Sequence, residues 1–309
     1  HIGYIFSMTI GAVVYDPGTV NRILGWLGMT TNVTQQMSMR YPIYLTLGLG
    51  FLALFTILGM KEPKLAGQSP KEKKHDGRTL REAGRLVLQA GKWMLQTPFV
   101  LAVILFAMTF DHILRMIVTM TSQYYRLIDL PEASFGLLGS AVALLGLVVP
   151  RLARSMSERF TPGRNVVLLA GISMAALWGL TWFIPYLGLL PMMLVFVGMM
   201  LTSFFTSHYL NQITESHQRA TVLSFKGLAF NAAYGMIGIL YAGLIQHLRQ
   251  DQQLQHLQWS AALIENEVFR QSIGWFPWYM SAMLIFIALV CLPRLRGSGS
   301  QPKKVFNFD

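Results

Sequence analysis

The stretch FAMTFDHILRMIVTM, residues 106–120, lies inside an apolar run from residue 99 to residue 123 and carries ionisable side chains near its middle. A helix needs about 20 predominantly apolar residues to cross the hydrocarbon core of a bilayer, and this run is long enough. An ionisable group at that depth costs several kcal/mol when it faces lipid. We therefore expect a membrane span whose polar side faces the interior of a helical bundle or a water-filled cavity.

Similar apolar runs recur along the chain of 309 residues, which is 53% hydrophobic and only 13% charged. A soluble domain carries about a quarter charged residues. In lipid every backbone polar group must bond within its own segment, so these runs must form helices. The sequence predicts an all-α, polytopic membrane bundle with about eight segments, the first of which is too short for a complete span: 1–15, 42–60, 99–123, 134–153, 165–184, 190–211, 221–246 and 276–293.

The charges of the connections fall into two unequal sets. The stretches 61–98, 154–164 and 212–226, with Arg151 and the tail after residue 293, hold 19 basic and 7 acidic residues. The alternate connections hold 5 basic and 6 acidic residues. Basic residues concentrate on the cytoplasmic side of membrane proteins. The net charge of +11 therefore indicates membrane orientation, and we expect no nucleic-acid partner.

Two of the basic connections carry recognisable motifs. RLARSMSERFTPGRN, residues 151–165, has an acid and a base followed by a glycine and a second base, and ESHQRATVLS, residues 215–224, precedes an apolar segment. Together with the order of two spans, a long cytoplasmic connection and six further spans, these motifs resemble the major facilitator superfamily of secondary transporters. The resemblance implies a cytoplasmic gating role, in a charge network across helix ends, for these residues: Glu158, Arg159, Gly163, Arg164 and Arg219. The alternative is an ordinary basic loop with a plain interfacial anchor.

The resemblance also implies how the chain is organised. Residues 1–60 would hold the last two helices of a first half, and residues 99–293 a six-helix second half. Residues 61–98 would form a cytoplasmic linker, whose second part has the apolar spacing of an amphipathic helix. Residues 294–309 read as a disordered cytoplasmic tail. On this reading about eight of an expected twelve helices are present and roughly the first four are missing.

The intramembrane charges are the strongest candidates for a site. Helical periodicity places Asp111 and Arg115 on one face, one turn apart, with His112 and Thr119 beside them. Two later segments carry polar rows that could meet this face, and in the superfamily the matching spans line the central cavity: Ser203, Ser207 and Asn211, then Asn231 and Tyr234. We expect solute recognition or proton coupling at this site, because ionisable residues inside a membrane are functional by default. The alternative is a static pair that neutralises itself and holds neighbouring helices.

These features predict a monomeric secondary active transporter that moves a small solute by alternating access, coupled to protons, in a bacterial inner (plasma) membrane. We expect no cofactor, no metal and no enzymatic activity, since the sequence has no DDxxD, no HExxH and no glycine-rich phosphate loop. Two other classes stay open. One is a membrane-embedded lipid-modifying enzyme, and the other is a non-transporting membrane receptor or scaffold.

Overall fold

The computed structural model describes residues 10–11, 13–29, 33–38, 40–59, 80–214 and 219–297. Within these ranges every regular element is helical. Seven helices there are long and apolar enough to cross a membrane: Gln36–Gly59, Pro98–Thr119, Phe135–Arg159, Pro162–Leu180, Leu189–Ile213, Thr221–Gln255 and Ala261–Leu295. The predicted class, a multi-pass helical membrane protein, is confirmed. Most of the predicted first segment, 1–15, lies outside the described residues, which there are 10–11 and 13–15.

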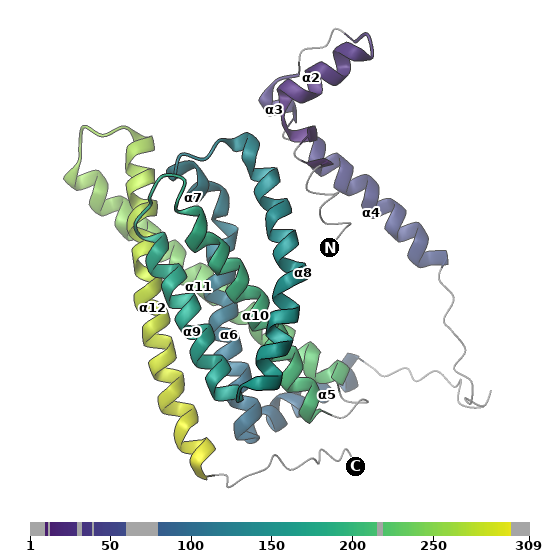
Figure 1. The fold of residues 1–309 in the computed structure, drawn as a ribbon, viewed down its shortest axis with the longest axis vertical. Helices are drawn as coiled ribbons and strands as arrows, with labels where there is room; N and C mark the ends of the chain where they lie inside the picture. Colours follow the sequence, from purple (N-terminus) through teal and green to yellow (C-terminus); the bar gives the residue numbers. More distant parts are fainter. Residues whose placement is uncertain are drawn as a thin grey trace. The chain divides into compact units, whose positions relative to one another are not determined.

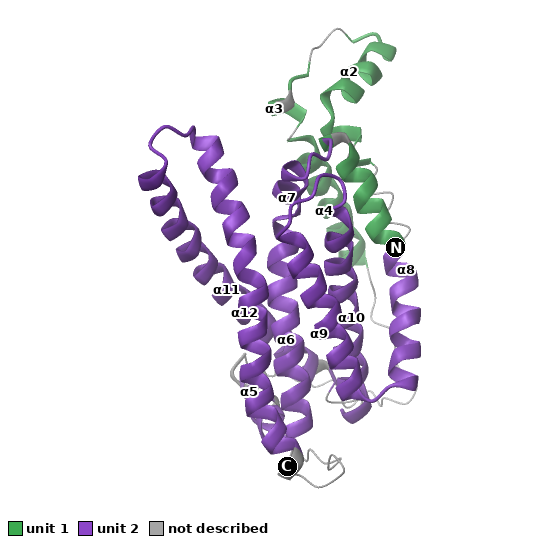
Figure 2. Ribbon diagram, turned by 60° about the vertical axis from the view of Figure 1, so that its left-hand side comes forward, with its two compact units in different colours: residues 1–79, 132–144 green, residues 80–131, 145–309 purple. Residues whose placement is uncertain are grey.

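By its internal contacts the chain divides into two compact units (Figure 2). One contains residues 1–79 and 132–144, and the other contains residues 80–131 and 145–309. Helix α8 (Phe135–Arg159) contributes residues to both. The domain boundaries expected from the sequence, at residues 60, 98 and 293, stay a prediction.

The first unit contains α2 (Pro17–Trp26), α3 (Gln35–Ser38), α4 (Tyr41–Gly59), the 3-10 turn η2 (Glu132–Ser134) and the first residues of α8. Asp16 caps α2, since its carboxylate accepts a 2.8 Å hydrogen bond from the backbone N–H of Thr19. The side chain of Asn21 on α2 contacts the backbone of Val33: it donates to the Val33 carbonyl at 3.1 Å and accepts from the Val33 N–H at 2.8 Å.

The second unit is built around one central helix (Figure 1). Its elements are α5 (Leu80–Gln96), α6 (Pro98–Thr119), α7 (Thr121–Leu127), most of α8, α9 (Pro162–Leu180), α10 (Leu189–Ile213), α11 (Arg219–Gln255) and α12 (Ala261–Gly297). Helix α6 packs against α5, α9, α10, α11 and α12. In the most apolar 18-residue stretch of α6, 67% of the residues are buried in the protein, whereas the buried share of the corresponding stretch is 39% or less in every other span. The polar residues of α6 are therefore held by protein on most sides.

Helices α6, α9 and α10 meet closely at Gly198. A Cβ added there would lie 3.1 Å from Leu114 Cδ1 on α6 and 3.3 Å from Ser173 Oγ on α9. A small residue at such a crossing lets backbones approach, which is a main source of helix association in lipid. The crossing fixes α6 in the bundle at Leu114, the residue directly before Arg115.

The span predicted as residues 99–123 is divided in the structure. Helix α6 ends at Thr119, and α7 begins at Thr121. The hydroxyls of Thr119 and Thr121 donate 2.7 Å hydrogen bonds to the carbonyls of Met116 and Val118. Such bonds compete with the helical ladder and favour a break. Hydropathy does not report hydrogen bonds, so the span predicted from the sequence continued past this break.

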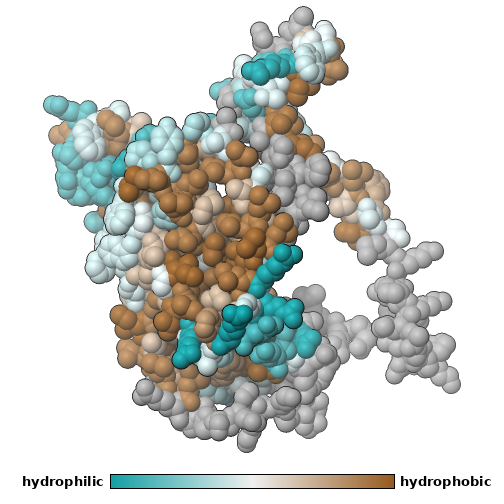
Figure 3. Space-filling view, in the orientation of Figure 1, coloured by the Kyte–Doolittle hydropathy of each residue, from teal (hydrophilic) through white to brown (hydrophobic). Residues whose placement is uncertain are grey.

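The last two helices are longer than predicted. The expected spans were 221–246 and 276–293, whereas α11 and α12 have 37 residues each. The Gln-rich stretch 247–275 is helical except for residues 256–260. Gln, Leu and Arg are all good helix formers, so the helices continue although the stretch as a whole is too polar for lipid. Figure 3 shows a broad hydrophobic band over the second unit, with hydrophilic residues gathered at the tip of the α11–α12 hairpin.

Candidate solute and ion site

Asp111 and Arg115 form an ion pair on α6. Arg115 Nη2 lies 2.5 Å from Asp111 Oδ2, and the two side chains are 31% and 15% exposed respectively. Apart from this contact, Asp111 Oδ2 has no hydrogen-bond partner among the described residues. A carboxylate oxygen can accept more than one hydrogen bond, so this one, placed near the middle of a span, is suited to receive a donor group from a solute.

Arg115 also reaches across to α11. Its Nη1 donates a 3.0 Å hydrogen bond to Asn231 Oδ1, and its guanidinium carbon lies 5.2 Å from the ring centre of Tyr234. A guanidinium over an aromatic face gains a cation–π attraction. The structure thus brings together four of the predicted residues: Asp111, Arg115, Asn231 and Tyr234.

Lys226 joins this group, and sequence reasoning missed it. It is half-buried on α11, a helix that packs against α6, and its Nζ lies 5.3 Å from the ring centre of Phe230. The available signal was its spacing, since Lys226, Phe230 and Tyr234 follow one another every fourth residue and so share a helix face.

His112 faces away from the ion pair. It is 2% exposed, and its Nδ1 lies 2.6 Å from the carbonyl oxygen of Met108. Because a carbonyl only accepts, Nδ1 carries the proton, and Nε2 accepts the 3.2 Å hydrogen bond from the hydroxyl of Tyr279 on α12. His112 therefore connects α6 to α12, and among the described residues no hydrogen bond joins it to Asp111 or Arg115.

The other predicted polar residues lie outside this cluster. Thr119 is exposed and its hydroxyl is bonded to its own helix. On α10, Ser203 and Asn211 are exposed and Ser207 is half-buried. Among the described residues, no hydrogen bond links this row to Asp111 or Arg115. The buried polar face of α10 is formed by Thr202, Thr206 and Tyr209 instead.

The predicted gating residues make local contacts. Glu158 accepts a 2.8 Å hydrogen bond from Nε of Arg154, one turn earlier on α8, and both side chains are more than half exposed. Arg159 ends α8, and Gly163 and Arg164 stand in the first turn of α9, where the side chain of Thr161 accepts from the N–H of Arg164 at 3.4 Å.

Arg219 begins α11 and donates to the carbonyls of Thr214 at 3.4 Å and Asn211 at 3.3 Å. It thereby satisfies acceptors at the end of α10, which lack partners within the helix. A gating role for Arg219 and for the α8–α9 connection stays a prediction.

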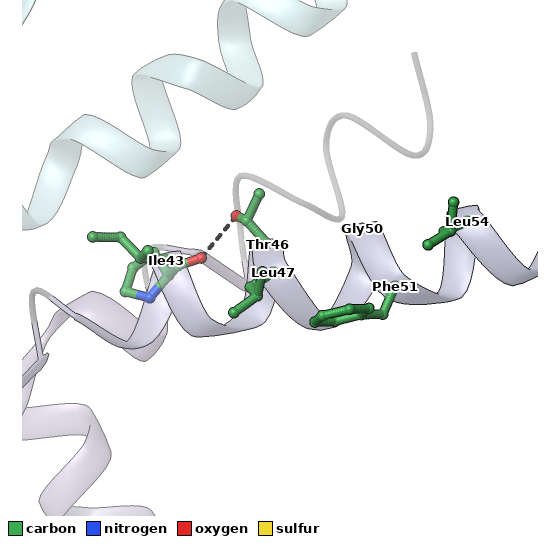
Figure 4. A pocket seen from close by; sticks show the side chains of 7 residues that line it. Ile43, Thr46, Leu47, Gly50, Phe51 and Leu54 are labelled. Carbon is green, nitrogen blue, oxygen red and sulfur yellow. Dashed lines mark hydrogen bonds between the residues drawn. The ribbon is translucent and has the colours of Figure 1, made fainter.

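Two further features lie outside this cluster. An apolar depression runs along α4 from Pro42 to Leu54 (Figure 4), but its walls come from that single helix and its one drawn polar contact is Thr46 Oγ1 to the Pro42 carbonyl, 2.7 Å. No group of three or more His, Cys, Asp or Glu side chains within the described ranges is arranged to hold a metal ion.

Comparisons with known families and solved structures identify the family and the fold of this bundle. The family model of the Major Facilitator Superfamily matches residues 1–242, which is most of the chain. This chain belongs to the major facilitator superfamily. No curated protein sequence matches this superfamily member. Among solved structures it is similar to a bacterial homologue of the human lysosomal transporter Spinster, crystallised in an inward-facing, unoccupied conformation.

That similarity has a TM-score of 0.62 at 15% identity and covers 97% of this chain and 70% of the other. At this identity it shows the fold alone. The superfamily and the fold together support a secondary transporter embedded in a membrane by several spans.

Proposed function

We propose that this superfamily member is a proton-coupled carrier that moves a small solute bearing an anionic group by alternating access. The observation that carries the proposal is the cluster of one acid and two bases between α6 and α11, formed by Asp111, Arg115 and Lys226. Its formal charge is positive by one, and a buried net charge is costly unless a counter-charge arrives.

The carboxylate of Asp111 and an anionic solute would compete for the same two cations. With Asp111 ionised, Arg115 is occupied by it on α6 and by Asn231 and Tyr234 on α11. Protonation of Asp111 removes its charge, and an anionic solute then becomes the favoured partner of Arg115 and Lys226. Release of the solute lets Asp111 lose its proton and pair with Arg115 again. Each solute would thereby move together with a proton.

The test uses the full-length, gene-encoded protein in proteoliposomes that contain a pH-sensitive dye. A panel of small carboxylates and phosphates is supplied beside uncharged and cationic analogues under an imposed proton gradient. We expect proton movement with one or more anionic solutes, and we expect Asp111→Asn to abolish it while solute exchange without a gradient persists. Asp251→Asn, on the outer part of α11, is the matched control and should behave as the unaltered protein.

Transport by Asp111→Asn with an unchanged pH dependence would end the coupling mechanism and leave Asp111 and Arg115 as a structural pair. Transport of cationic solutes in preference to anionic ones would overturn the solute class. The monomeric state and the bacterial inner membrane stay predictions from the sequence.

A further inference from the structure

A second cavity lies away from the ion pair, between α6, α9, α10 and α12. Its volume is about 540 Å³, and its walls are almost entirely apolar, with Phe106, Ala170 and Leu284 among the lining residues. None of its lining residues belongs to α11 or to the Asp111 cluster. Binding pockets for small ligands are typically apolar cavities of about 300–1,000 Å³ with a few placed polar groups. The cavity therefore has the size and surface of a ligand site that transport at Asp111 does not use.

The polar groups of the cavity gather at one end. Asn165 stands in the first turn of α9, and Tyr209 in the last turns of α10. Thr202 and Thr206 also line the cavity, but their hydroxyls donate to the carbonyls one turn earlier, at 2.7 Å and 2.6 Å. The end with Asn165 and Tyr209 belongs to the side of the bundle that carries the basic α8–α9 connection.

Asn165 and Tyr209 each keep one unused hydrogen-bonding function. Asn165 Nδ2 donates to the Tyr209 hydroxyl oxygen at 2.7 Å and to the carbonyl of Met156 at 3.3 Å. Asn165 is fully buried, and its Oδ1 has no partner among the described residues. The hydroxyl hydrogen of Tyr209 likewise has no acceptor in the described part of the chain. A buried acceptor without a partner costs about 1–3 kcal/mol, so this end favours a ligand group that both donates and accepts, as a hydroxyl does.

The length of the cavity matches one membrane leaflet. On α6 its lining extends from Phe99 to Phe110, and on α12 from Leu284 to Leu295. At about 1.5 Å per helical residue these stretches are roughly 17 Å long. Half of a hydrocarbon core of about 30 Å is roughly 15 Å. The polar end lies near the helix termini and the apolar end near mid-span, which is the polarity of a lipid seated in its own leaflet.

We infer that this cavity binds a single-chain acylglycerol from the leaflet on the basic side of the membrane. The acyl chain lies between α6, α9, α10 and α12. A glycerol hydroxyl donates to Asn165 Oδ1 and accepts from the hydroxyl of Tyr209. The bound lipid completes the hydrogen bonding of Asn165 and fills a space that four packed helices leave open.

The experiment is photolabelling of the full-length protein in detergent micelles with 1-oleoylglycerol that carries a diazirine in its acyl chain, followed by peptide mapping. We expect the labelled peptides to come from α9, α10 and α12 around the cavity. Ala170→Trp and Ala288→Trp fill the cavity from two different helices and should each lower the labelling at least fivefold. Ala175→Trp is the matched control, since Ala175 is exposed on α9 and does not line the cavity.

The headgroup contact is tested by Tyr209→Phe, which should weaken competition by unlabelled 1-oleoylglycerol about fivefold. Its dimethyl ether can accept from Tyr209 but cannot donate to Asn165, so it should compete more weakly than 1-oleoylglycerol with the unaltered protein, and Tyr209→Phe should weaken it further. Monodisperse elution in size-exclusion chromatography confirms that each variant is folded. Equal labelling of all folded variants, or labels spread evenly over lipid-facing residues, would overturn the inference.

Discussion

The ion pair of α6 makes a sharp prediction about stability. Removal of one partner of a buried pair costs about 3–5 kcal/mol, because the other charge is left behind. Asp111 and Arg115 are partly exposed, Arg115 keeps Asn231 and Tyr234, and Asp111 keeps the charge of Lys226 nearby. We therefore expect Asp111→Asn and Arg115→Gln each to lower the free energy of unfolding by about 2–3 kcal/mol.

The double variant should lose about as much as either single one, because it removes both charges of the pair together. The resulting coupling energy is about 2–3 kcal/mol, within the range found for residues in contact. The assay is reversible unfolding by titration of sodium dodecyl sulfate into mixed micelles, followed by circular dichroism. The matched control is Arg154 and Glu158, which have the same spacing and a 2.8 Å contact but are exposed. Their cycle should show no measurable coupling. Additive losses at Asp111 and Arg115 would refute the pairing.

Two further predictions rest on the junction of α7 with the start of α10. Gly188→Ala places a Cβ 2.7 Å from the hydroxyl of Tyr124 and 2.9 Å from Ile128 Cγ2, so it should lower the free energy of unfolding by about 1–3 kcal/mol. Gly171→Ala is the control, because open space surrounds that position, and it should raise the free energy of unfolding by about 0.5–1 kcal/mol. A Gly188→Ala protein as stable as the unaltered one contradicts this packing. Burial raises the pKa of Tyr125 from 10.0 to about 12, so between these pH values the unfolded chain releases a proton that the folded chain keeps. Tyr125 should then contribute a fall of about 1.4 kcal/mol per pH unit to the free energy of unfolding, and Tyr125→Phe should make the alkaline decline shallower by that amount.

Relations within one helix were predictable from the sequence, and relations between helices were not. The spacing of Asp111 and Arg115 placed them one turn apart, and the structure pairs them. His112 is adjacent in sequence, but the 100° step per residue turns it toward Tyr279 on α12. A polar row predicts that a helix has a protein-facing side, but it does not identify the partner helix. The role of Ser203 therefore stays a prediction, and the position of Lys226 beside the ion pair was not predicted.

The fold was predictable at the level of span number and class, because about 20 apolar residues in a row admit few alternatives. The residues at which the helices end were less predictable. The break at Met120 depends on two threonine hydroxyls, and hydropathy does not report hydrogen bonds. The cavity beside Asn165 leaves no trace in the sequence at all, since its walls are ordinary apolar residues from four helices and its shape is what they fail to fill.

The paired extensions of α11 and α12 have a practical consequence. At 37 residues each these helices are roughly 55 Å long, far more than a bilayer core of about 30 Å. Arg249 and Glu265 join them through a two-pronged contact of 2.6 Å and 2.9 Å, and the rings of His256 and Trp259 stack at 3.8 Å in the connection. A soluble domain inserted between residues 256 and 260 would be held in a fixed orientation relative to the bundle. It would give this small membrane protein the rigid marker that single-particle image alignment requires.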